Sequence, residues 1–152
     1  TNQQTMFDLP LYDVLSEKVL YDSFHTMCKA EFTIENLNAY EAVLNMMSLN
    51  DLQERKRYFR QFYDLYISNE GKFTINVQDK LRQQAESLLA NPELLEDSQN
   101  MDFLCNEIRF LLFDPYKRYK STTLFQEAFL KSKKKASMRP KTVPLHDPWC
   151  CL

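Results

Sequence analysis

Glycine is almost missing from this chain: among its 152 residues, Gly71 is the only one. Tight hairpins, Greek keys and β-sandwiches need glycine where the backbone takes a positive φ, so this composition argues against them. It also excludes a glycine-rich loop of the kind that cradles phosphate groups. We therefore expect an all-α protein that holds no cofactor.

Histidine is scarce as well, with His25 and His146 as the two examples. His25 and Cys28 are spaced by one helical turn, but no third and fourth ligand follow at matching spacing, so a structural pair is favoured over a metal site. His146 lies close to Cys150 and Cys151, and metal binding there stays an alternative, although a disordered tail is a poor frame for ligands. No Ser-His-Asp or Cys-His arrangement can be assembled. We expect a protein that is not itself an enzyme.

No apolar run is long enough to cross a bilayer, and no signal peptide is visible. The chain starts at Thr1 without methionine, which indicates an excised fragment. Cys28 and Cys105 sit in apolar helical patterns and are predicted to be buried free thiols. The adjacent Cys150 and Cys151 make a poor disulfide framework, so a reducing, cytoplasmic compartment fits best.

The net charge of −2 gives no general footprint for nucleic acid, and we expect none as a partner. Charge is unevenly distributed, however. Six basic residues fall within eleven positions near the C-terminus: Lys131, Lys133, Lys134, Lys135, Arg139 and Lys141. Setting these and Asp147 aside leaves 13 basic and 20 acidic residues among residues 1–130, a net charge of −7. The chain is thus an acidic body with a basic tail.

Apolar residues recur at helical spacing through most of the chain, with 44% hydrophobic and 13% aromatic residues to form a core. Capping residues mark several helix starts: Asp8, Thr33, Asn50 or Asp51, and Ser121 or Thr122. Gly71 is predicted to end the helix that begins near residue 51. We expect an N-terminal extension (1–8), a helical domain (9–130) and a basic, Cys-terminated tail (131–152). Within the domain we expect a four-helix bundle from residues 50–113 beside a subdomain of terminal helices.

Three polar clusters interrupt these helices at predicted boundaries. They are Glu31-Phe32-Thr33-Ile34-Glu35-Asn36-Leu37, Phe73-Thr74-Ile75-Asn76-Val77 and Asp114-Pro115-Tyr116-Lys117-Arg118-Tyr119. No nucleophile or metal set accompanies them. Polar residues placed in this way indicate a surface that grips a partner.

In order and spacing, these clusters resemble the regulator of G-protein signalling (RGS) domain family over about residues 9–130. The first is similar to the family's Glu-aromatic-x-x-Glu-Asn stretch, and the others to its next two contact segments. The resemblance implies an RGS fold that binds the GTP or transition-state form of a heterotrimeric Gα subunit and accelerates its GTPase activity. The Gα contact is then expected at Glu31, Glu35, Asn36, Asn76, Phe110, Asp114 and Arg118, with Arg118 bracing Asp114. Pro115 departs from the pattern, because many relatives carry Ser there, and it removes a backbone donor.

Other interpretations of the same residues stay open. Thr33, Glu35 and Asn36 are typical of a helix start, Asn76 of a cap for the next helix, and Asp114 of a helix stop. The fold could also serve an adaptor that binds a partner or membrane without accelerating GTP hydrolysis. The basic tail is either a solvated charge run or a patch for the anionic inner face of the plasma membrane, with lipidation at Cys150 and Cys151. Trp149 to Leu152 is not a prenylation box.

Overall fold

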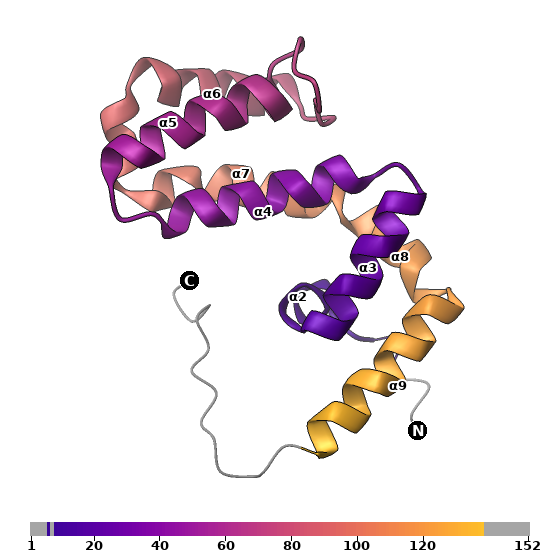
Figure 1. The fold of residues 1–152 in the computed structure, drawn as a ribbon. Helices are drawn as coiled ribbons and strands as arrows, with labels where there is room; N and C mark the ends of the chain where they lie inside the picture. The colour runs from indigo at the N-terminus through magenta and orange to yellow at the C-terminus, as the bar shows by residue number, and fades with distance from the viewer. Residues whose placement is uncertain (1–5, 7, 139–152) are drawn as a thin grey trace.

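The chain folds into helices joined by short loops. A computed structural model describes residue 6 and residues 8–138, and this part contains no β-strand. The helices are α2 (Leu11–Ser16), α3 (Lys18–Ala30), α4 (Ile34–Ser48), α5 (Leu52–Phe62), η1 (Tyr63–Ile67), α6 (Asp79–Ala90), η2 (Pro92–Glu96), η3 (Ser98–Met101), α7 (Asp102–Leu111), α8 (Phe113–Lys120) and α9 (Thr123–Ser137) (Figure 1). The predicted all-α class is confirmed.

Four helices, α4 to α7, form the bundle in Figure 1, and α4 packs on both α5 and α7. The expectation that the bundle begins at residue 50 was wrong, because α4 opens it at Ile34. This helix buries Leu37, Val43 and Met46, among others, in the common core. The apolar face of α4 therefore packs against bundle helices as well as against α3.

The terminal helices α2, α3, α8 and α9 form the second part of the fold, where α3 packs on α9, α2 and α8. Its centre is aromatic: the ring of Tyr119 lies 5.2 Å from that of Phe24 and 5.0 Å from that of Phe125, measured between centroids. The Tyr119 hydroxyl donates to the carbonyl of Leu20 at 3.3 Å. Chain segments about a hundred residues apart are thereby joined.

Ordered structure extends past both ends of the predicted domain, residues 9–130. Met6 is buried in the core, so the fold includes part of the segment taken as an N-terminal extension. At the other end, α9 runs to Ser137 instead of ending at residue 130. Lysine is a good helix former and is stabilised near a helix C-terminus by the helix dipole, so Lys134 and Lys135 favour this continuation. The tail residues 139–152, with Cys150 and Cys151, lie outside the described residues.

The chain reverses direction after η1, a single π-helical turn that extends α5 as far as Ile67. Gly71 was expected to end this helix, but it lies beyond the actual C-cap, Ser68. Glycine is required there for a different reason. A Cβ at Gly71 would lie 2.6 Å from the Leu65 carbonyl oxygen and 2.8 Å from that of Asp64, closer than real contacts allow. The loop folds back tightly on η1.

Arg55 is the one charged residue buried within the described part of the chain, with 7% of its surface exposed. Its guanidinium donates to backbone carbonyls of three segments: Met46 at 3.2 Å, Leu49, Leu95 at 2.6 Å and Glu96 at 2.9 Å. It thereby ties the end of α4 and the α4–α5 loop to η2. Carbonyls at helix ends lack partners within the helix, and the guanidinium supplies donors there in addition to the Leu49 N–H, which reaches the Met46 carbonyl at 3.2 Å.

Candidate functional site

The first polar cluster forms the loop between α3 and α4. Thr33 occupies the N-cap position of α4, as predicted, but its side chain does not cap that helix. Instead, both its backbone N–H and its hydroxyl donate to the carbonyl of Cys28, at 2.9 and 3.3 Å. The loop is fastened to the end of α3. Cys28 beneath it is a buried free thiol, as is Cys105, so the prediction for this pair is confirmed.

Phe32, at the tip of this loop, has a φ of 58°, the one positive value for a non-glycine residue among those described. The residue is 89% exposed. This residue ends α3 in the left-handed conformation, with the N–H groups of Phe32 and Thr33 donating to the carbonyls of Lys29 and Cys28 at 3.4 and 2.9 Å. Glycine is usual at such a position because a side chain with a Cβ is disfavoured there. Sequence reasoning quoted Phe32 within the motif but missed it as a site residue. The signal was an aromatic residue between two polar ones at a helix boundary.

The second polar cluster, between η1 and α6, is held by its own backbone. The N–H groups of Phe73 and Ile75 donate to the carbonyls of Leu65 and Tyr66, at 3.0 and 2.9 Å. Ile75 is buried and anchors the segment in the core. Asn76 remains exposed, and the N-cap of α6 is Gln78. The interpretation of Asn76 as a helix cap is therefore wrong.

These two loops meet around a shallow pocket of about 250 Å³. The residues that line it are Phe32, Thr33, Glu35, Asn36 and the segment 72–76. Within the described part of the chain, the side chains of Asn36, Glu35 and Asn76 make no hydrogen bond. The helix-start interpretation gives Asn36 no capping bond either, since the α4 N-terminus has none from a side chain. The pocket therefore presents polar groups that are free to bind a partner.

The third segment joins this surface through an ion pair. Nε and Nη2 of Arg118 in α8 donate to the same carboxylate oxygen of Glu31, at 3.0 and 2.9 Å. Arg118 was expected to brace Asp114, but the hydrogen bonds go to Glu31, and Asp114 adds only electrostatic attraction. The pKa of Arg118 is raised chiefly by the hydrogen bond with Glu31. Because both groups are partly exposed, the pair contributes little to stability, but it orients Glu31.

Asp114 lies in the first turn of α8, where a carboxylate is favoured by the helix dipole. It is not the stop of α7, which already ends at Leu111. Pro115 explains the break, since it has no N–H to donate to the Leu111 carbonyl and continue the α7 ladder. Its ring is buried, so it is not part of the exposed surface.

Two aromatic rings flank Asp114. Phe110 is 69% exposed, and its ring meets that of Phe113 edge to face, with centroids 6.0 Å apart. Phe110 was predicted as an apolar contact, whereas Phe113 was missed. An exposed aromatic pair next to a carboxylate provides apolar area beside the polar groups.

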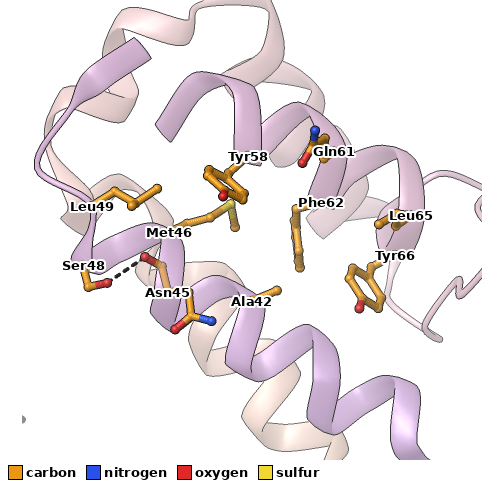
Figure 2. Close-up of a pocket in the computed structure, with 10 residues that line it drawn as sticks. All are labelled: Ala42, Asn45, Met46, Ser48, Leu49, Tyr58, Gln61, Phe62, Leu65 and Tyr66. Carbon is orange, nitrogen blue, oxygen red and sulfur yellow. Dashed lines mark hydrogen bonds between the residues drawn. The ribbon is translucent and has the colours of Figure 1, made fainter. Parts of the chain in front are cut away.

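A larger pocket, of about 510 Å³, lies between the C-terminal half of α4 and the α5–η1 helix (Figure 2). None of its ten lining residues is charged, and Met46, Tyr58 and Phe62 are among them. It contains none of the predicted site residues. Within the described residues there is also no group of three or more metal-ligating side chains.

A comparison with known proteins agrees with this architecture. The family model of the regulator of G protein signaling domain matches residues 11–128, most of the chain. The chain belongs to this family, as the sequence resemblance indicated. It is also 30% identical over 78 residues to regulator of G-protein signaling rgs-6 of Caenorhabditis elegans. The aligned stretch covers 49% of this chain and 11% of that protein. The chain therefore corresponds to a small part of this relative's length. Family membership links the chain to the regulation of G-protein signalling.

Proposed function

We propose that this domain is a GTPase-activating protein for a heterotrimeric G-protein α subunit and so terminates signalling. The observation that carries the proposal is the pocket between the α3–α4 and η1–α6 loops. There Glu35, Asn36 and Asn76 present unpaired polar groups at fixed positions, with Glu31 held beside them by Arg118. A family match over most of the chain supports the same conclusion.

The chemistry in this proposal belongs to the Gα subunit, which supplies its own arginine and its own glutamine to orient the attacking water. The domain needs only to hold the mobile switch segments in their transition-state arrangement. Asn36 suits this role because an amide both donates and accepts hydrogen bonds, so it can engage the Gα glutamine and the switch backbone. Glu31, Glu35, Asn76 and Asp114 offer oxygen acceptors to the switch backbone, and Phe110 offers apolar contact.

Rigid loops make such a surface effective. The hydrogen bonds from Thr33 to Cys28, and from Phe73 and Ile75 to η1, fix both loops before any partner arrives. Groups that are already in place need no reorganisation when the transition state forms, which is the main source of electrostatic catalysis. The strained Phe32 fits this view, since a preorganised loop is where strain is stored.

The test is single-turnover GTP hydrolysis by Gα subunits of several classes, with and without the full chain. We expect the domain to accelerate GTP hydrolysis by Gα subunits of at least one class. Asn36→Ala should reduce that acceleration by roughly tenfold or more, because Asn36 acts on groups that react in the transition state. Its melting temperature should change little, since the side chain makes no hydrogen bond to any described residue.

A matched control is Asn45→Ala, the same substitution at an exposed position near the other end of α4. It should leave both acceleration and stability unchanged. If Asn36→Ala melts earlier yet accelerates GTP hydrolysis by Gα as the wild type does, Asn36 is structural and this site assignment is wrong. If the wild-type domain binds Gα without accelerating any class, the adaptor interpretation is correct instead.

A further inference from the structure

The C-terminal half of α9 leaves large apolar side chains in solvent. Earlier in the helix, Phe125 and Phe129 are buried in the core. Leu130 is 61% exposed and Met138 81% exposed. These two are eight residues apart with Lys134 midway between them, so all three lie along one face of the helix. This face is not used for packing within the described fold.

The same half of the helix is strongly basic. Lys131, Lys133, Lys134 and Lys135 follow Leu130, and no acidic residue occurs between positions 128 and 138. Lys133 and Lys135 face Asp13 and Glu17 across a cleft on the inner side, so part of their charge is offset. Lys133 also lies over the ring of Phe129, at 5.3 Å from its centroid.

The outer face differs from the inner one. Lys134 lies there between Leu130 and Met138. Lys131 borders this face, and on its inner side it shares a cleft with Asp22 and Glu127. We call Leu130, Lys131, Lys134 and Met138 the α9 surface. It combines basic and exposed apolar side chains on a protein whose first 130 residues carry a net charge of −7.

We propose that the α9 surface docks this domain on a membrane rich in anionic phospholipid. A helix with lysines beside exposed apolar residues lies in the plane of the bilayer interface, with the apolar side chains at the boundary of the headgroups. The lysines are attracted by the negative surface potential, while the acidic body is repelled, and this fixes the orientation. The exposed Leu130 and Met138 favour a lipid surface over nucleic acid as the partner. Nucleic acid phosphates would attract the lysines but would not bury these apolar side chains.

The location of the α9 surface is compatible with the candidate Gα site. In Figure 1 the C-terminal end of α9 lies far from the α3–α4 loop, so docking there leaves that loop open. Peripheral binding is the relevant mode, because no described helix is long and apolar enough to cross a bilayer. The proposal does not depend on GTPase activation, and its test contains no Gα.

The test is cosedimentation of the full chain with vesicles of phosphatidylcholine alone or with 30% phosphatidylserine, the composition being a choice of roughly physiological surface charge. We expect binding to the anionic vesicles only, and its loss as salt is raised. Lys131→Gln/Lys134→Gln should weaken binding by roughly thirtyfold, since each lysine near such a surface is worth about fivefold. Leu130→Gln/Met138→Gln should weaken binding by a similar factor at each salt concentration where the wild type still binds, because the apolar contribution is not electrostatic.

The matched control is Arg57→Gln/Lys80→Gln, which makes the same change in net charge at exposed positions of α5 and α6 and should bind like wild type. Circular dichroism melts verify that each variant is folded. The proposal is overturned if the chain ignores anionic vesicles at low salt, or if control and α9 variants weaken equally. It is also overturned if an oligonucleotide binds more tightly than the vesicles through the same lysines.

Discussion

Replacing Arg55 should be among the most damaging single changes in this fold. Its guanidinium supplies donors to the carbonyls of Met46, Leu49, Leu95 and Glu96. Arg55→Met fits the space but removes the guanidinium donors. The Met46 carbonyl keeps the N–H of Leu49 at 3.2 Å, so the loss falls on the other three carbonyls. An unsatisfied buried polar group costs about 1–3 kcal/mol, and water can reach the carbonyls of Leu49 and Glu96, which are only partly buried.

We therefore expect a loss of about 3–5 kcal/mol, the sum of such penalties over the carbonyls of Leu49, Leu95 and Glu96. For a chain of this length, that lowers the melting temperature by roughly 10–15 °C. Arg55→Lys should cost less, since an ammonium keeps the charge and some donors but cannot reach all four carbonyls at once.

Urea unfolding followed by circular dichroism measures this loss. Arg57→Met, on the same helix but exposed, is the control and should change stability by less than about 0.5 kcal/mol. A loss below about 1 kcal/mol for Arg55→Met would refute the reasoning, because the carbonyls would then be satisfied without the guanidinium.

Three further predictions concern the site and its surroundings. Phe32→Gly should relieve the left-handed strain and leave the free energy of unfolding, measured by urea titration, within about 1 kcal/mol of wild type. It should nevertheless reduce the acceleration of GTP hydrolysis by Gα in single-turnover assays. Gly71→Ala should destabilise by about 1–3 kcal/mol, measured in the same titration, because the new Cβ meets the Leu65 carbonyl. Burial raises the pKa of the Cys28 thiol from 9.0 to about 11, so the folded state holds that proton more tightly. The stabilisation from this pKa difference is complete below pH 9 and is lost as the pH rises to 11, so the urea midpoint should fall over this range. Cys28→Ala should make that fall smaller.

Features set by local sequence were predictable. The Asp51 carboxylate accepts a hydrogen bond from the N–H of Glu54 at 2.8 Å, as expected for the start of α5. Cys28 and Cys105 were expected to be buried from the apolar periodicity around them, and both are. Helical class follows from the same local signals, since capping residues and a period of 3.6 depend on neighbours a few positions away. The family followed from the order and spacing of three polar clusters.

Features set by distant contacts were not predictable. The partner of Arg118 is Glu31, 87 positions away, whereas the family resemblance implied Asp114. Arg55 looked like one more charged residue in a basic stretch, because the carbonyls that bury it come from η2 and the end of α4. The positive φ of Phe32, by contrast, is local: the N–H groups of Phe32 and Thr33 donate to the carbonyls of Lys29 and Cys28 and so end α3.

The most direct test of the central claim compares the affinity of this domain for one Gα subunit in three states: GDP, a non-hydrolysable GTP analogue, and GDP with aluminium fluoride. A surface that preorganises the switch segments for hydrolysis must bind the transition-state mimic most tightly and the GDP form most weakly. Isothermal titration with wild type and with Asn36→Ala gives the comparison, and the variant should lose this preference. Equal affinity of the wild-type domain for the GDP form and the transition-state mimic would contradict the account.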